Sequence, residues 1–409
     1  MKVFRTLDAQ LQRNLLVLFT AGLLFWSSLA SLLPTLPLYV EDVGGTQQQI
    51  GFVMGSFAIG LLLFRSLLGR LADEHSRKIV LLIGMGTVAS APLGYMLVQS
   101  IPLLMALRAF HGISLAAFTT GYSAMVADIA PAKNRGEVIG YMSLVNPIGA
   151  AIGPALGGFL QATAGYTALF FLSACLGFVG LVCTAQILNP PVNSNQQSLP
   201  TSNQFWRLLG SPRIRVPAAV LLLVGLSFGT LSTFVPLFIK SVGVDLNAGL
   251  FYTAAAISSF SMRLVTGRAS DRYGRGLFIT LSLILYTLSM LLLWSAQSAG
   301  AFLVAATVEG AGAGILIPTV AALVADRALP QERGRLFGLC MVGFDLGIAI
   351  AGPVLGSLAQ QVGYRNIFGF ASSLTFLAII IFLTQSSKDL PHSLRFGLGR
   401  GRDLYALSK

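Results

Sequence analysis

The chain contains the segment GRLADEHSRK at residues 69–78 and a related segment, GRASDRYGR, at residues 267–275. Each segment joins two long apolar stretches, and the second copy begins 198 residues after the first. A glycine, an aspartate and an arginine keep the same spacing in both copies: Gly69, Asp73 and Arg77, then Gly267, Asp271 and Arg275. Charged residues are rare beside the apolar stretches, so this recurrence indicates a chain built from two copies of one plan.

Apolar stretches occupy most of the sequence. Of the 409 residues, 55% are hydrophobic and only 10% are charged, whereas roughly a quarter of a soluble domain is charged. This composition excludes an ordinary soluble enzyme, and the absence of period-two alternation excludes barrel strands. A bilayer core about 30 Å thick needs roughly 20 apolar residues per helix, so we predict an all-α polytopic membrane protein with twelve transmembrane helices. They lie near 14–38, 49–70, 79–98, 101–127, 137–160, 167–189, 215–239, 248–268, 277–296, 301–326, 335–359 and 366–385.

The duplication extends beyond the two loop segments. At the same offset of 198, Arg65 matches Arg263, Asp128 matches Asp326, Arg135 matches Arg333, and Gly165-Tyr166 matches Gly363-Tyr364. We therefore predict an N-terminal six-helix bundle (1–189), a polar cytoplasmic linker (190–214), a C-terminal six-helix bundle (215–387) and a basic cytoplasmic tail (388–409). Repeated six-helix halves are typical of transporters that bind their substrate between the halves.

Basic residues gather in the loops on one side of the predicted spans. The net charge is +12, from 27 Lys and Arg against 15 Asp and Glu. With the N-terminus inside, 22 of the 27 basic residues lie in inside segments and only Lys240 and Arg365 lie outside. Because basic residues near span ends stay in the cytoplasm, both termini are predicted to be cytoplasmic, in a plasma or inner membrane. The same rule accounts for the charge without a nucleic-acid partner.

The first loop segment resembles the G-x-L-A-D-R-x-G-R-K signature of the major facilitator superfamily, and the second matches its D-R-x-G-R part. The first copy departs from the signature at Glu74 and Ser76, which puts its turn and charge pattern in doubt. The resemblance implies twelve helices in two bundles and transport by alternating access. It also implies that Asp73 and Arg77, and by symmetry Asp271 and Arg275, tie the bundles together at the cytoplasmic face. Gly69 is expected to let two helices approach closely.

The fifth predicted span carries small residues at regular spacing. Gly149, Gly153 and Gly157 lie four residues apart, with Pro154 and Gly158 between and beside them. This stretch resembles the antiporter motif of proton-linked drug exporters, which implies export rather than uptake. A generic helix-packing face has the same physical features, so that alternative stays open.

Arg108 lies inside the fourth predicted span, about 10 Å deep at 1.5 Å per residue. His111 follows on the same helix face, and the stretch from Arg108 to Gly112 resembles the family's R-x-x-x-G motif, whose arginine is implicated in proton coupling. The position that matches Arg108 in the second half is Ala306, so this charge belongs to one half only. An ionisable residue within a span is a candidate functional site. His111 is equally compatible with a neutral, hydrogen-bonded core residue.

Two acids lie inside spans of the second half. Glu309 occupies the position that matches His111, and Asp345 lies about 15 Å into the eleventh span. A buried carboxylate without a basic neighbour in its helix can exchange a proton, so we expect one of them to couple transport to protons. Glu309 is favoured because the first helices of three-helix units line the cavity in this family. Pairing of either acid with Arg108 is the alternative.

Further charges recur in both halves near the inside ends of the spans. Arg65 and Arg263 are expected to snorkel to the cytoplasmic surface and to hold Asp128 and Asp326 or lipid phosphate. With Arg135 and Arg333 they form a predicted cytoplasmic charge relay.

These features together favour a secondary transporter that exports small amphiphilic molecules or metabolites in exchange for protons. Proton-coupled uptake or facilitated diffusion of a sugar or metabolite is the alternative. A non-transporting membrane receptor fits less well, because gating segments are expected in a chain whose two bundles move relative to each other. An enzyme is not expected, since the three histidines, His75, His111 and His392, are far apart and no nucleophile–base set is present. We expect no cofactor, no metal site, no ATP-binding domain and a monomer in the lipid bilayer.

Overall fold

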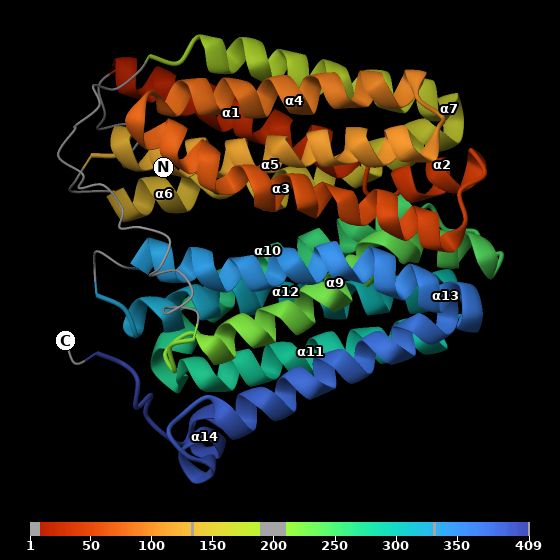
Figure 1. Ribbon diagram of the computed structural model, residues 1–409. Coiled ribbons are helices and arrows are strands. Elements are labelled where there is room, and N and C mark those ends of the chain that lie inside the picture. Colours follow the sequence, from red (N-terminus) through yellow and green to blue (C-terminus); the bar gives the residue numbers. More distant parts are fainter. Residues whose placement is uncertain (1–8, 132–134, 189–209, 330–332, 408–409) are drawn as a thin grey trace. The chain divides into compact units, whose positions relative to one another are not determined.

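The computed structural model describes residues 9–131, 135–188, 210–329 and 333–407, and within them the chain is helical without strands (Figure 1). Residues 190–209, most of the expected linker, lie outside the described part. The helices are α1 (Ala9–Ser31), α2 (Leu36–Asp42), α3 (Gln47–Glu74), α4 (Arg77–Leu97), α5 (Ile101–Ile129), α6 (Arg135–Met142), α7 (Val145–Ala185), α9 (Arg215–Ser241), α10 (Ala248–Tyr273), α11 (Arg275–Ser295), α12 (Ala299–Asp326), α13 (Arg333–Gln385) and α14 (Leu390–Gly397). The predicted all-α membrane fold is confirmed.

Glycines at matched positions divide two of the long helices. Ten stretches of the described chain are long and apolar enough to cross a membrane. Two of them contain a non-helical residue, Gly165 in α7 and Gly363 in α13, each with φ of 80°. A side chain strongly disfavours this backbone conformation, so glycine is required. Counting the segments on either side of Gly165 and Gly363 separately turns the ten stretches into the twelve predicted spans.

The chain forms two compact units. The first contains residues 1–45, 52–197 and 247–253, and the second contains 46–51, 198–246 and 254–409. In the first unit α1 packs along α7, and α4 packs against α5 and α7. In the second unit α9 packs along α13, and α11 packs against α12 and α13. The duplicated sequence therefore produces the same helix pairings twice.

Each unit has its own apolar core. In the first unit Leu18 and Phe25 of α1 pack with Met85 of α4 and Phe118 of α5. The rings of Phe25 and Phe118 are stacked with their centroids 3.8 Å apart. The second core draws its side chains from α9, α11, α12 and α13. Buried apolar contacts thus fix how the helices pair within each unit, while many outward-facing side chains are apolar as well.

The two loop segments turn in different ways. Before α4, Ser76 is extended, with φ of −165°, and its hydroxyl accepts a hydrogen bond from the backbone N–H of Ile79 at 3.4 Å. Before α11, Gly274 has φ of 100° and no side-chain cap. Ser76 thus replaces the glycine of the family signature with a side-chain helix cap. Serine in place of glycine at residue 76 therefore changes the conformation of the turn, but α4 still begins at the next residue.

Three short helices, α2, α6 and α14, were not predicted. The expected span 137–160 begins within α6, and a turn at residues 143–144 separates α6 from α7 inside one apolar stretch, Gly136–Ala185. The tail was expected to be basic without assigned structure, yet it contains α14. Asp389 caps α14 by accepting the N–H of His392, and Pro391 lies in its first turn. These are strong local start signals.

Candidate functional site

Arg77 joins three helices at the first loop segment. Its NH1 lies 2.8 Å from Oδ1 of Asp73, at the end of α3, and its Nε lies 3.3 Å from Oδ2 of Asp128, at the end of α5. It also donates to the carbonyl of Ala72. Because Arg77 is the first residue of α4, one guanidinium connects the ends of α3, α4 and α5.

Arg275 repeats this arrangement in the second unit. It pairs with Asp271, its Nε lies 3.3 Å from Oδ2 of Asp326, and its NH1 donates to Oγ of Ser270 at 2.9 Å. The geometry of the two copies matches atom for atom at the second aspartate. The duplicated motif therefore builds the same arginine-centred cluster at the ends of α10, α11 and α12.

Asp128 and Asp326 pair with the motif arginines, and Arg263 interacts electrostatically with Tyr286. The expectation that Arg65 and Arg263 hold these aspartates or lipid phosphate stays a prediction. One expectation about the loop segments needs correction. Within the described part, a Cβ added at Gly69 or Gly267 would meet no atom within 4 Å, so the close helix approach expected at Gly69 is not formed there.

The glycines of the fifth span form a contact face. Gly149, Gly153 and Gly157 lie against α1, at Trp26, Ser27 and Ser31 respectively. A Cβ built on Gly153 would lie 2.6 Å from the carbonyl oxygen of Ser27, closer than any side chain tolerates. Pro154 lies within α7, and Gly158 is buried. The face therefore packs α7 directly on the backbone of α1, as the helix-packing interpretation requires.

Arg108 and His111 lie in a closed polar cluster within the first unit. His111 is fully buried, and Arg108 is 6% exposed. The hydroxyl of Tyr95, from α4, lies 3.2 Å from Nδ1 of His111, and NH1 of Arg108 lies 3.4 Å from the same nitrogen. The guanidinium of Arg108 also covers the ring of Phe57, with Cζ 4.4 Å from its centroid, which is a cation–π contact.

The cluster assigns a protonation state to His111. A guanidinium only donates hydrogen bonds, so Nδ1 of His111 must accept from Arg108. The imidazole is then neutral and carries its proton on Nε2, which has no hydrogen-bond partner among the described residues. A positively charged neighbour also disfavours a second cation. This geometry fits the neutral core histidine that the sequence left open.

Glu309 has a related environment in the second unit. It is 3% exposed in α12, and its carboxyl interacts with the hydroxyl of Tyr286 from α11. Oε1 of Glu309 has no hydrogen-bond partner in the described chain. Arg263 of α10 also interacts electrostatically with Tyr286. Asp345, the other acid, is 5% exposed in α13.

Sequence reasoning missed the tyrosines at both positions. Tyr95 lies 16 residues before His111, but Tyr286 lies 23 residues before Glu309. The two tyrosines are therefore not related by the offset of 198, and comparison of the halves could not find them. The only signal was a tyrosine within an apolar helix, because a buried tyrosine hydroxyl usually has a partner.

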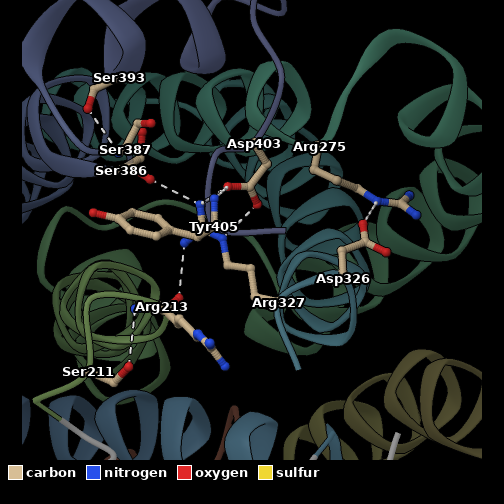
Figure 2. A network of polar contacts seen from close by, with 10 residues as sticks. All are labelled: Ser211, Arg213, Arg275, Asp326, Arg327, Ser386, Ser387, Ser393, Asp403 and Tyr405. Carbon is tan, nitrogen blue, oxygen red and sulfur yellow. Dashed lines mark hydrogen bonds and ion pairs between the residues drawn. The ribbon is translucent and has the colours of Figure 1, made fainter. Parts of the chain in front are cut away.

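Arg327 was treated only as an inside loop charge, yet it is fully buried at the end of α12 (Figure 2). Its Nε and NH2 bind both carboxylate oxygens of Asp403, at 2.6 and 3.0 Å. NH1 donates to the carbonyl of Arg213, and NH2 donates to that of Ser386, both at 3.0 Å. Arg327 therefore ties the tail to the start of α9 and the end of α13. The matched residue in the first half is Ile129.

Twelve apolar spans in two similar units, duplicated charged clusters and ionisable groups buried within the spans define a multi-pass membrane transporter. The chain belongs to the Major Facilitator Superfamily, whose profile matches residues 18–275 and 245–398. The resemblance seen in the two loop segments is thereby confirmed.

Named relatives cover nearly the whole chain. It is 27% identical over 380 residues to the multi-drug resistance efflux pump PmrA of Streptococcus pneumoniae, covering 88% of this chain and 92% of that protein. It is 24% identical over 382 residues to multidrug resistance protein 1 of Bacillus subtilis, covering 93% and 97%. Among solved structures, a mutant of the nucleoside transporter NupG superposes with a TM-score of 0.80 at 16% identity, covering 90% of this chain and 99% of NupG. At that identity the likeness concerns the fold.

Proposed function

We propose that this transporter exports small amphiphilic molecules in exchange for protons, with Glu309 as the proton-carrying group. Several relatives of nearly full length are named as multidrug resistance proteins or efflux pumps, which supports the direction and the cargo class. The glycine face of α7 resembles the antiporter motif and supports the same direction.

The buried carboxyl of Glu309 carries the proposal. Burial of an ionised carboxylate costs several kcal/mol or more unless it is paired and hydrogen-bonded. Tyr286 donates to one oxygen, but Oε1 has no partner among the described residues. A proton removes the cost while the site is closed, and water reaching the site during the transport cycle releases it. Glu309 can thus link proton movement to conformational change.

The arginine clusters supply the conformational part of the proposal. Arg77 and Arg275 hold the helix ends together within their units. In the proposed cycle both clusters lie at the cytoplasmic face, where they stabilise the outward-facing state and loosen as the bundles rock. Both termini are cytoplasmic in this proposal, and the protein acts as a monomer in the inner or plasma membrane.

Proton-coupled uptake is the second candidate. The nucleoside transporter NupG shares the fold, and the same buried carboxyl could couple uptake. The two candidates differ in the direction of proton movement when cargo is added, because an antiporter releases protons from the compartment that cargo enters.

Purified protein in sealed vesicles with an internal pH dye tests the proposal. Vesicles containing outward-oriented protein are given a lipophilic cationic dye such as ethidium, with no imposed gradient. Exchange predicts that dye entry drives protons out and raises the internal pH. Dye entry with internal acidification would indicate co-transport and replace the export proposal by uptake, and dye movement without any pH change would remove proton coupling altogether. Vesicles without protein serve as the control.

A further inference from the structure

The tail carries a short helix that the transport features do not use. α14 lies at the ends of α11 and α13 (Figure 1). Its Ser393, Phe396 and Gly397 are buried. Oγ1 of Thr280, in α11, donates to the carbonyl of Gly397 at 2.8 Å, and Oγ of Ser393 accepts the N–H of Ser387 at 2.9 Å. One face of α14 is therefore fixed on its own bundle.

A second flank of α14 is apolar and exposed. Leu390 is 51% exposed, Leu394 is 38% exposed, and Leu398, the residue that follows the last helical residue, is 48% exposed. Residues four apart lie on the same side of a helix, so the three leucines form one stripe. Three exposed leucines along one side of so short a segment are unfavourable in water, because each leaves apolar surface hydrated.

The stripe follows directly after the last predicted span. On α13 the apolar side chains Phe376, Leu377 and Ile380 are exposed, as are Leu281 and Ile284 on α11. In a membrane protein such surfaces contact lipid. After Gln385 the chain becomes polar and α14 begins five residues later, so we expect α14 at the level of the headgroups.

Exposed basic side chains lie in the same segment as the stripe. The described part of the tail has two acids: Asp389, which caps α14 and is itself exposed, and Asp403, which binds Arg327. Four exposed basic side chains outnumber Asp389: Lys388, Arg395, Arg400 and Arg402.

We propose that α14 is a membrane-interface helix that binds anionic phospholipid. Its leucine stripe enters the boundary between headgroups and acyl chains, and the basic side chains contact the lipid phosphates, as amphipathic interfacial helices do. Contacts within the second unit fix the position of α14. The Asp403–Arg327 pair anchors the chain after it, and the N–H of Leu407 donates to the carbonyl of Asp326 at 3.0 Å. Asp326 also pairs with Arg275, so bound lipid adjoins the second arginine cluster.

Lipid depth tests the position of the stripe. Full-length protein with Cys175, Cys183 and Cys340 replaced by alanine receives an NBD label at Leu394→Cys or, as the matched control, at His392→Cys. At 100° per residue these positions point about 160° apart. In nanodiscs of phosphatidylcholine and phosphatidylglycerol, lipid with a doxyl group near the headgroup should quench the label at 394 at least about twofold more than the label at 392. Equal quenching would overturn the proposal.

Lipid charge tests the basic side chains. Phosphatidylglycerol titrated into protein in phosphatidylcholine nanodiscs should shift the emission at 394, and Arg395→Gln should raise the midpoint roughly fivefold. Arg395→Lys keeps the charge and should titrate like the parent. Salt at about 1 M should weaken the response, since it screens charge beyond about 3 Å. An unchanged midpoint in Arg395→Gln, or the same shift produced by inorganic phosphate alone, would overturn the assignment to anionic lipid.

Discussion

His111 and Glu309 occupy matched positions in the two halves, and each meets a tyrosine from the preceding helix. Tyr95 and Tyr286 do not occupy matched positions in α4 and α11. The duplication therefore preserved the positions of His111 and Glu309 but not that of the tyrosine beside each. In the first unit the histidine is neutral beside Arg108, whereas in the second an acid stands in its place. His111 and Glu309 therefore differ in chemistry although the helices around them are arranged alike. For this reason we assign the transported proton to Glu309 alone.

Glu309→Gln tests this assignment. The change keeps the shape of the side chain and removes its titrating group, so accumulation driven by a pH gradient should be lost while cargo exchange without a gradient continues. Transport by both modes is measured in the same vesicles. Asp345→Asn is the matched control, because it removes another buried carboxyl. Full pH-driven accumulation in both variants would remove proton coupling from these two acids.

Arg327 should dominate the stability of the tail. Asp403→Asn leaves a fully buried guanidinium without its counter-charge, which costs about 3–5 kcal/mol when a buried ion pair is broken. The melting temperature of the purified protein should therefore fall. The exposed Asp245→Asn in the same unit should leave it unchanged. Adding Arg327→Met to Asp403→Asn should restore part of the loss, and no recovery would show that the pair is not the source.

At the scale of elements, the contact between α1 and α7 depends on missing side chains. Gly157 lies against the backbone of Ser31, and a Cβ there has no room unless the helices separate. Gly86, in α4, would meet no atom within 4 Å among the described residues. The two glycines therefore differ in packing alone.

Gly157→Ala should destabilise the first unit by about 1–3 kcal/mol through overpacking. Gly86→Ala should instead stabilise it by roughly 0.5–1 kcal/mol, because alanine loses less backbone entropy in a helix. Thermal unfolding of the two variants in detergent measures both effects. Equal changes in the unfolding temperature of the two variants would show that α1 and α7 can separate enough to accommodate the added methyl group.

The start of α14 should respond to acid. The backbone N–H of His392 donates to Oδ1 of Asp389 at 2.9 Å, and that bond, with the side chain of His392 and the charge of Arg395, holds the pKa of Asp389 below its ordinary value. A lowered folded-state pKa means that the ionised cap stabilises α14 above the ordinary aspartate pKa, about 4. The contribution is lost as the pH falls through the folded-state value.

An NBD label at Leu394→Cys should report this loosening as a red shift of emission below about pH 4. Asp389→Asn still accepts the hydrogen bond but does not titrate, so its emission should not change over that interval. An acid response of equal size in Asp389→Asn would assign it to another group.

At the scale of the whole molecule, two units of the same pairing pattern arise from one duplicated plan. The matched glycines Gly165 and Gly363 break the long helices at equivalent points, and the arginine clusters close equivalent helix ends. The asymmetric features are Arg108 in the first unit and Glu309, Arg327 and α14 in the second. In our proposals, proton coupling and the interfacial helix therefore both belong to the second unit of a symmetric scaffold.

The twelve-span topology makes a simple prediction. Tags at both termini and at residue 195 should be accessible from the cytoplasm, and tags at Gly45 and Gln297 only from outside, because the basic loops stay inside. Protease protection of tagged protein in sealed vesicles measures each side. A tag on the opposite side would mean that a span is miscounted or that the orientation is reversed.

Sequence alone determined the helix class, the spans and the duplication. Burial in lipid requires a run of apolar residues of set length, which is a local property that can be read along the chain. A packing face at Gly149, Gly153 and Gly157 was one of two alternatives that the sequence offered, since their spacing places them on one side of a helix. The turn within the fifth span and the helix in the tail were not anticipated, because hydropathy does not register a short turn or a short, half-buried helix.

Only the tertiary structure decided which polar groups meet. Asp128 and Asp326 pair with Arg77 and Arg275, Tyr95 and Tyr286 reach the matched positions, and Arg327 binds Asp403 across 76 residues of chain. Each of these contacts joins different helices or segments, so it depends on how neighbouring helices rotate and cross. Close packing of apolar side chains sets that rotation, and no single stretch of sequence contains it.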